Sequence, residues 1–454
     1  MSSTIENVDD MLSMLPGEVL SRILSLMPTK YAVRTSVLSK RWRYTWTSVT
    51  NLDFDYTRRL RSNENIITKF VDGNEKNFIK FVDRALKFRK TSNVELFRLH
   101  ISNYHHAIGS SVSNWIDNAV RLNVRELDIC VLQSRLPLSV FTCKTLTNLR
   151  FELSVCDYCV WEFPSSIYLP CLKTLELVGY CNPFIEVFNF IRGCPVLESL
   201  SLEVSSNDEE DYIFNIPTLK RLKLIYISAT DCYENKIVLH VPKLEHLFVG
   251  GVLCSFFEMK DVSSLVGASI TCWQSTSDFM WADILNKITG VQNLSIEIFP
   301  FTSPLPIFSN MKQLELKGTW ESGQIIQFLE SCPELKILSI DFVDCRDFKK
   351  QKPEEPKLIP ACMLTNLTAI KFSNCIGDTC DMKFLQYMLG NAQVLKAVTV
   401  FAQENLLIEE NACFCEQVLK IPRASPHCEI RFRTWKSPPP QEFEDDDPYE
   451  GFAF

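Results

Sequence analysis

The sequence predicts an α/β solenoid preceded by a small three-helix module, and three observations support this prediction. A six-residue pattern, apolar-x-x-apolar-x-apolar, recurs twelve times between residues 96 and 400. Residues 10–50 carry no copy of it but space their apolar side chains as helices do. Hydrophobic residues make up 46% of the 454-residue chain and charged residues 22%, which is the composition of a folded protein with a large core.

The repeated pattern predicts short parallel strands that stack on one another. Its second half alternates with period two, which places two aliphatic side chains on one face of a strand. A single copy cannot bury that face alone, so neighbouring copies share a continuous core and form a curved, horseshoe-like stack. The copies are LFRLHI (96–101), VRELDI (124–129), LTNLRF (146–151), LKTLEL (172–177), LESLSL (197–202), LKRLKL (219–224), LEHLFV (244–249), VQNLSI (291–296), MKQLEL (311–316), LKILSI (335–340), LTAIKF (367–372) and LKAVTV (395–400).

The residues between copies predict the return path of the chain. FIEVFNFIRGCP (184–195) and IIQFLESCP (325–333) have the pattern of short amphipathic helices that stop before a proline. Cys194 and Cys332 then fall at the corner between helix and strand, where we interpret them as small core residues. The interval from 244 to 291 has room for one further, degenerate copy.

The N-terminal module predicts three short helices. The first begins after Pro16, the second follows Thr29, and the third follows Ser39 and holds Trp42 and Trp46. The apolar residues of the first helix recur with amphipathic spacing at Val19, Leu20, Ile23, Leu24, Leu26 and Met27. Three helices in about 40 residues give too small a core for independent stability, so we expect a partner to complete it.

Charge separates this module from the rest of the chain. The formal net charge is −8, yet residues 15–50 contain one acid, Glu18, and six basic residues: Arg22, Lys30, Arg34, Lys40, Arg41 and Arg43. A helix-turn-helix that contacts phosphates is one interpretation, but the basic residues do not share one recognition helix. A docking surface for an acidic protein fits better. An ordinary solvated surface is the third possibility.

Other site classes find little support in the sequence. Cys156 and Cys159 form the single C-x-x-C of the sequence, without the second such pair that a structural zinc site uses, so we expect no metal and no cofactor. Nucleotide-binding glycine patterns and the common hydrolase motifs are missing, so we expect no catalytic residue. The N-terminal residues are acidic, and no apolar stretch approaches the ~18 residues of a membrane helix. We therefore expect a protein of the cytoplasm and/or nucleus, with no membrane contact.

The N-terminal motif resembles an F-box over residues 10–57. The matching segments are L-P-x-E-x-L-x-x-I-L-S-x-M-P and A-V-R-T-S-V-L-S-K-R-W-R-Y-x-W. The resemblance implies docking onto the Skp-type adaptor of an SCF-type cullin–RING ubiquitin ligase, and through it contact with cullin and RING subunits. The matching positions that it implies for adaptor binding are Leu15, Pro16, Ile23, Leu24, Val37, Leu38, Ser39, Trp42 and Arg43.

The remaining segments resemble the plant F-box/leucine-rich-repeat/FBD-domain family. The repeats resemble irregular leucine-rich repeats, and FLQYMLGNAQVLKAVTV (384–400) with RASPHCEIRF (423–432) resembles an FBD domain. The acidic, proline-bearing end is typical of a disordered tail. The expected boundaries are F-box 10–57, helical linker or cap 58–95, leucine-rich repeats 96–345, linker 346–358, FBD domain 359–435 and tail 436–454.

Together these resemblances imply a substrate-recognition subunit that is not itself an enzyme and whose protein target is unknown. The alternatives are a hormone or small-molecule co-receptor and, less favoured, a nucleic-acid-bound regulator. Side chains that alternate with the buried aliphatics point away from the core, where we expect the target to dock. In the middle repeats the candidate target-binding residues are Glu176, Arg221, Lys223, His246 and an exposed Phe248.

Overall fold

A computed structural model describes most of the chain. The described residues are 15–56, 71–91, 93–101, 106–131, 136–153, 163–180, 185–206, 211–228, 236–252, 256–272, 278–297, 304–318, 320, 322–342, 359–375, 379–402 and 408–434. The predicted linker 346–358, the tail 436–454 and the Cys156/Cys159 pair lie outside these ranges. The chain divides into two compact units, Met1–Asp208 and Glu209–Phe454.

Unit 1 begins with the predicted short helices. They are α2 (Gly17–Leu24), α3 (Thr29–Arg34) and the 3-10 helices η1 (Thr35–Val37) and η2 (Trp42–Ser48). Pro16 precedes α2 and Pro28 precedes α3, in extended conformations that start each helix. Helix α2 ends three residues earlier than the apolar spacing predicts, because the chain tightens after Ile23, where the Leu26 amide donates to the Ile23 carbonyl.

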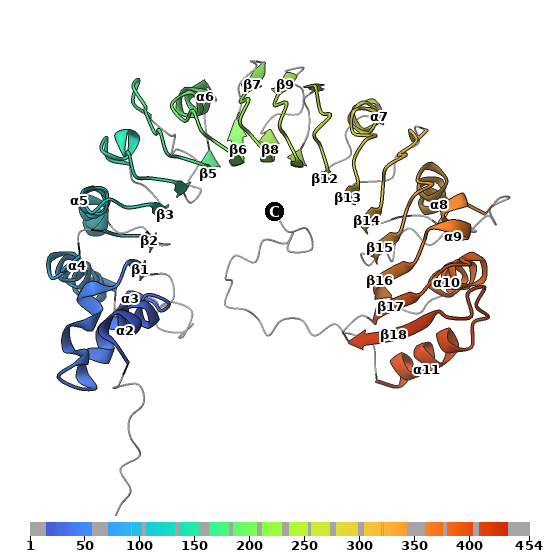
Figure 1. The fold of residues 1–454 in the computed structure, drawn as a ribbon, viewed down its shortest axis with the longest axis horizontal. Coiled ribbons are helices and arrows are strands. Elements are labelled where there is room, and N and C mark those ends of the chain that lie inside the picture. Colours follow the sequence, from blue (N-terminus) through green and yellow to red (C-terminus); the bar gives the residue numbers. More distant parts are fainter. Residues whose placement is uncertain are drawn as a thin grey trace, which may run out of the picture. The chain divides into compact units, whose positions relative to one another are not determined.

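The repeats of unit 1 form a parallel sheet in chain order (Figure 1). Its strands are β1 (Asn51–Asp55), β2 (Leu96–Ile101), β3 (Glu126–Val131), β4 (Asn148–Leu153), β5 (Thr174–Tyr180) and β6 (Ser199–Ser206). The connecting helices lie on one side of these strands: α4 (Val71–Lys87), α5 (His106–Arg121), η4 (Val140–Thr142) and α6 (Ile185–Arg192). This is the predicted solenoid arrangement, in which one sheet face packs on helices and the other is left open.

The large-sheet strands of unit 2 are also parallel and follow chain order. The strands are β8 (Arg221–Ser228), β10 (His246–Val252), β12 (Gly267–Cys272), β13 (Asn293–Glu297), β14 (Gln313–Gly318), β15 (Ile337–Phe342), β16 (Ala369–Cys375), β17 (Ala397–Ala402) and β18 (Glu429–Thr434). The helices are α7 (Asp278–Lys287), α8 (Ser322–Ser331), α9 (Ala361–Thr365), α10 (Thr379–Asn391) and α11 (Ile408–Leu419).

A second, small sheet in unit 2 was not expected from the sequence. Strands β7 (Tyr212–Asn215), β9 (Lys236–His240) and β11 (Phe256–Lys260) pair in parallel in the order β11-β9-β7. They occupy the return path that helices take in other repeats. Tyr212, Phe214 and Leu239 of these strands are buried, so this sheet contributes to the core as the helices do.

The strand register corrects and extends the repeat series. Leu127 pairs with Phe97 and Ile129 with Leu99, so the first in-register copy is 94–99, two residues before the predicted one. A further copy lies at 49–54, where Leu52 and Phe54 pair with Phe97 and Leu99. The degenerate copy expected between 244 and 291 is confirmed as β12, in which the small Ala268 takes an aliphatic position.

The corners between helix and strand are buried, as predicted for Cys194 and Cys332. The two side chains are 3% and 0% exposed, and burial raises the pKa of the Cys194 thiol to about 12. A thiol that ionises less readily than free cysteine is a poor nucleophile, so a structural role is favoured. Cys428, at 4% exposed, is likewise core.

The predicted C-terminal motif R-x-S-x-x-C fastens strand β18 to the repeat before it. The buried Ser425 hydroxyl donates to the Leu395 carbonyl at 2.6 Å, and Arg423 donates to the Cys428 carbonyl at 2.8 Å. These bonds satisfy buried carbonyls where the chain turns into the strand. The motif therefore orders the end of the sheet.

Candidate functional site

The N-terminal helices bury one face and leave apolar side chains on the other. Leu20, Leu24 and Ala32 are at most 1% exposed and form the inner face. Exposed on the outer side are Val19 (41%), Leu26 (83%), Tyr31 (49%), Val37 (85%), Leu38 (66%) and Tyr44 (59%), which we name the N-terminal apolar surface. Six exposed large apolar side chains on a module this small are typical of a protein-binding surface.

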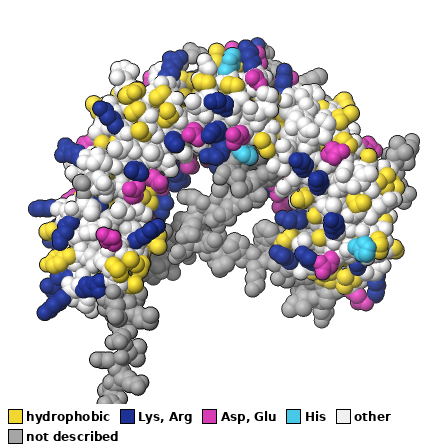
Figure 2. Space-filling view, in the orientation of Figure 1, with side chains coloured by type: hydrophobic (Ala, Val, Ile, Leu, Met, Phe, Trp, Pro, Cys, Tyr) yellow, Lys and Arg dark blue, Asp and Glu magenta, His cyan; other side chains and the backbone are white. Residues whose placement is uncertain are grey.

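Basic side chains surround these apolar residues. Arg22, Arg34, Lys40, Arg41 and Arg43 are exposed, and Glu18 is the acid among them. Arg34 lies over the ring of Tyr31, with its guanidinium carbon 5.7 Å from the ring centroid. Figure 2 shows Lys and Arg side chains between apolar ones over this end of unit 1. The local charge suits an acidic partner, which the overall charge of −8 would otherwise repel.

The structure divides the predicted adaptor-binding residues into two groups. Pro16, Val37, Leu38, Ser39 and Arg43 are exposed, and Leu15 and Ile23 are half-buried, so these side chains are accessible to a partner. Leu24 and Trp42 are 1% and 7% exposed.

Direct contact of Leu24 and Trp42 with a partner is therefore a wrong expectation for the described conformation, because both side chains are occupied in packing the helices together. They support the apolar surface from beneath. Burial cannot be read from a motif that mixes contact and core positions.

The open face of the unit 1 sheet carries a row of alternating charges. At one register level the neighbouring strands β1 to β5 present Asp53, Arg98, Asp128, Arg150 and Glu176, which we name the charge ladder. Arg98 Nε lies 2.8 Å from Asp128 Oδ2, and Arg150 Nε lies 3.3 Å from Glu176 Oε1. Cross-strand pairs of opposite charge stabilise a sheet and fix its register.

Asp128 is the centre of this ladder. Its carboxylate also accepts from His100 Nε2 at 2.9 Å and lies 3.5 Å from Arg150 Nη1. Burial alone would raise the pKa of Asp128, but the hydrogen bonds from His100 and Arg98 and the charge of Arg150 outweigh it. The pKa of Asp128 is lowered to about 2, so the carboxylate stays ionised well below neutral pH.

The structure places the candidate target-binding residues on the open face of each unit's sheet. Glu176 belongs to the charge ladder, where Arg150 holds it. In unit 2, Arg221 pairs in register with His246, and Lys223 pairs with Phe248. The side chains of Arg221, Lys223 and His246 are half-buried. These four predicted positions form one patch on β8 and β10.

The prediction that Phe248 is exposed is wrong, since its side chain is 1% exposed. Gly250 follows two residues later on the same face and has no side chain, and a Cβ added there would lie 3.0 Å from the Phe248 ring. The ring therefore lies down against the sheet, with Lys223 Nζ 5.8 Å from its centroid. Sequence alternation indicates the face of a residue but not whether its neighbours cover it.

Comparison with protein families assigns each part of this architecture. Family models match the F-box domain at residues 12–54, the leucine-rich repeats of FBD-associated F-box protein At5g56370 at 112–269, and the FBD domain at 354–400. The fold and matches define an F-box protein with leucine-rich repeats.

Arabidopsis thaliana proteins resemble the chain over nearly its whole length. F-box/LRR-repeat protein At3g59200 is 30% identical over 93% of this chain and 88% of its own length. FBD-associated F-box protein At4g13985 is 30% identical over 93% and 95%, and F-box/FBD/LRR-repeat protein At1g78750 is 28% identical over 93% and 96%. The chain belongs to the plant F-box/FBD/LRR-repeat family.

Two further properties concern the described residues alone. None of the described helices combines the length and the apolar character that a membrane span requires. Within the described ranges, no group of three or more His, Cys, Asp or Glu side chains is arranged to hold a metal ion.

Proposed function

We propose that this chain is the substrate-recognition subunit of an SCF-type cullin–RING ubiquitin-protein ligase, in the cytoplasm and/or nucleus. The observation that carries the proposal is the exposure of Val37 and Leu38, at 85% and 66%, within the residues that match the F-box family. Burial of two such side chains contributes about 1.5–3 kcal/mol each to association, before the costs of binding. A Skp-type adaptor that presents apolar and acidic groups fits this surface.

The open sheet faces are the proposed contact with the target protein. In unit 1 the charge ladder gives this face a fixed pattern of charges, and in unit 2 Arg221, Lys223 and His246 leave polar groups accessible. A rigid surface with mixed charge selects a partner by complementary pattern. Ubiquitin transfer then occurs on other subunits, and this chain contributes proximity between the target and the ligase.

The test is co-purification of the tagged full chain from plant cells with identification of its partners by mass spectrometry. We expect a Skp-type adaptor and a cullin to co-purify with the wild-type chain, and neither to co-purify with the double variant Leu15→Ala, Pro16→Ala. Leu15 is half-buried and Pro16 is exposed, so both side chains are accessible to a partner. Circular dichroism of both proteins controls for folding. Adaptor capture by the variant at wild-type level, or no adaptor with the folded wild type, would contradict the proposal.

A further inference from the structure

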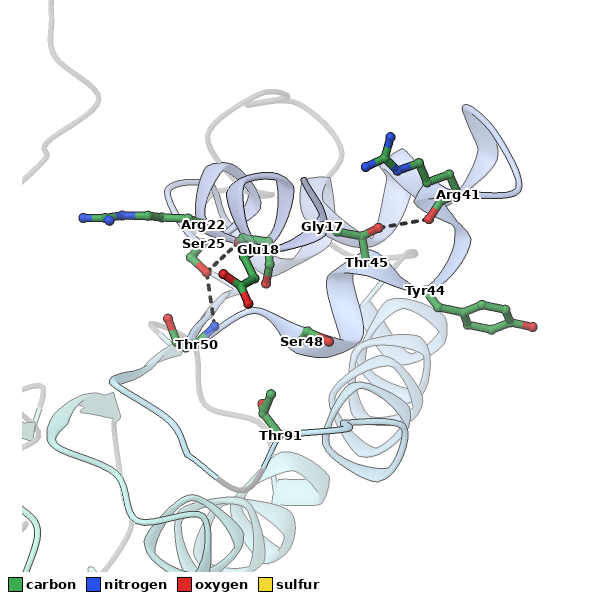
Figure 3. A pocket seen from close by; sticks show the side chains of 11 residues that line it. Gly17, Glu18, Arg22, Ser25, Arg41, Tyr44, Thr45, Ser48, Thr50 and Thr91 are labelled. Atoms are coloured by element: carbon green, nitrogen blue, oxygen red, sulfur yellow. Dashed lines mark hydrogen bonds between the residues drawn. The ribbon is translucent and has the colours of Figure 1, made fainter. Parts of the chain in front are cut away.

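A cavity of about 680 Å³ opens between the N-terminal helices and the segment that leads into β2 (Figure 3). It is lined by residues of α2, of η2 and of the segments at Thr50 and Thr91. Most of its lining is hydroxyl-bearing: Ser21, Ser25, Thr45, Ser48, Thr50, Thr91 and Tyr44. A pocket with this many hydroxyl groups offers several hydrogen-bonding groups to a ligand.

The Thr91 hydroxyl of the lining can donate a hydrogen bond to a ligand. Thr91 Oγ1 accepts a hydrogen bond from Arg89 Nη2 at 2.8 Å, so its own hydrogen is available to donate to another group. Ser25 Oγ, by contrast, donates to the Ser21 carbonyl and accepts from the Thr50 amide. In Figure 3 the side chains of Ser25, Ser48, Thr50 and Thr91 surround the same space.

Arg89 places an uncompensated positive charge directly behind this wall. Its Nη2 donates to the Val49 carbonyl at 2.7 Å, to Thr91 and to the Asn93 carbonyl at 3.4 Å, all neutral groups. Its Nε and Nη1 are buried without a hydrogen-bond partner, and among the described residues no carboxylate pairs with it. Burial lowers the pKa of the guanidinium to about 10, so a nearby negative charge would stabilise it.

We propose that this cavity binds an oxyanion, namely a phosphate group carried by a small molecule or a phosphorylated side chain. Arg22 and Arg41 belong to the lining, but Figure 3 shows their guanidinium groups directed away from the space, and Arg41 donates to the Leu15 carbonyl. Lys90 Nζ lies 5.4 Å from the ring centroid of the lining residue Tyr44, so Arg89 is the main cation behind the proposal. Hydroxyls and guanidinium groups are the side chains that hold phosphate oxygens most effectively. The cavity shares Tyr44 with the N-terminal apolar surface, but Val37 and Leu38, the exposed residues that carry the proposed adaptor docking, are not in its lining.

Glu18 provides a decisive contrast within the same cavity. It is the single acid among the lining residues, and Figure 3 shows its carboxylate directed into the space. If the ligand is an oxyanion, Glu18 opposes it, and Glu18→Gln should tighten binding several-fold. If the ligand were an amine, the same variant would weaken binding, and the proposal would be wrong.

The experiment is isothermal titration of the purified full chain with inorganic phosphate, pyrophosphate and O-phosphoserine, each at constant ionic strength. We expect saturable binding with one ligand per chain. Ser48→Asp should weaken it at least tenfold by placing a carboxylate in the lining, and Arg89→Gln should weaken it similarly. Arg84→Gln, an exposed residue of α4 with the same change in charge, is the matched control and should bind as the wild type does.

The ligands separate the two sources of the phosphate group. Tighter binding of O-phosphoserine than of pyrophosphate points to a phosphorylated side chain, and the reverse order points to a small polyphosphate. Equal weak binding in the wild type, Ser48→Asp and Arg89→Gln, or none in the wild type, would overturn the proposal. Because Ser48→Asp and Glu18→Gln change surface-accessible groups, the test holds even if Arg89→Gln fails to fold. Adaptor capture measured on the same preparations distinguishes failure of this site from failure of the proposed function.

Discussion

His100 and Asp128 lie on neighbouring strands with the His100 Nε2 atom 2.9 Å from Asp128 Oδ1, and this bond joins a histidine to the charge ladder. Asp128 thereby gathers contacts from both neighbouring strands, since Arg98 and His100 of β2 and Arg150 of β4 approach the same carboxylate. A carboxylate that several donors hold in its ionised form links its protonation to stability.

The first prediction concerns this carboxylate and pH. The folded-state pKa of Asp128 is about 2, below the ordinary value of 3.8, so its contribution to stability is present above pH 4 and is lost as pH falls toward 2. We expect Asp128→Asn to lower the free energy of unfolding by about 2 kcal/mol at pH 7. Urea denaturation followed by circular dichroism measures this difference.

The control for this prediction is Glu126→Gln on the same strand, which is exposed. The difference between wild type and Asp128→Asn should shrink between pH 4 and pH 2, whereas Glu126→Gln should change stability by less than about 0.5 kcal/mol. A difference that stays constant over this pH range would show that the ladder does not control the ionisation of Asp128.

The second prediction concerns the residues beneath the N-terminal apolar surface. Leu24 and Trp42 are buried, so Leu24→Ala should destabilise the folded chain by about 2–5 kcal/mol and Trp42→Ala by about 3–5 kcal/mol. Leu26→Ala, at 83% exposed, is the matched control and should have little effect. Thermal unfolding measures all three. Unchanged stability of Trp42→Ala together with lost adaptor capture would identify Trp42 as a contact residue instead.

The third prediction concerns the open face of unit 2. Replacing Arg221, Lys223 and His246 with alanine should leave stability within about 1 kcal/mol, as for other accessible positions. It should reduce target capture in co-purification and leave adaptor capture unchanged. Lys243→Ala, an exposed residue of the turn before β10, is the control. Normal target capture by the triple variant would place the docking site elsewhere.

The fourth prediction concerns nucleic acid. The six basic residues of the N-terminal module are spread over α2, α3, η2 and the segment before η2, so few phosphates of a duplex are neutralised together. We expect negligible affinity for random duplex DNA at physiological salt, measured by fluorescence anisotropy. Sub-micromolar affinity with a steep dependence on salt concentration would favour the nucleic-acid interpretation.

Repeats were predictable wherever their aliphatic residues are regular. The copy at 49–54 has the same pattern in Val49, Leu52 and Phe54, but it begins inside the range 10–50 whose apolar spacing predicts helices. The first copy was placed two residues late because Ile101 continues the same alternation on the buried face. Alternation with period two repeats itself at every second residue, so only pairing with a neighbour fixes the register.

The candidate sites were less predictable than the fold. Exposure of Val37 and burial of Leu24 depend on how short helices pack, and Phe248 is covered because a glycine lies beside it. The charge ladder was missed because its members are 22 to 45 residues apart and meet only through strand register. Arg89 carries no sequence signal, since nothing local marks an arginine as buried without an acid.

The most direct test of the proposed function is the affinity of the purified full chain for a Skp-type adaptor, measured by titration calorimetry. The double variant Val37→Asp, Leu38→Asp places two charges at the exposed apolar positions of η1 and its C-cap. The control variant Leu138→Asp places one charge at a 72% exposed apolar position elsewhere in unit 1. We predict at least a hundredfold loss of affinity for the double variant and wild-type affinity for Leu138→Asp. Wild-type affinity in the folded double variant would contradict the assignment of this surface to adaptor binding.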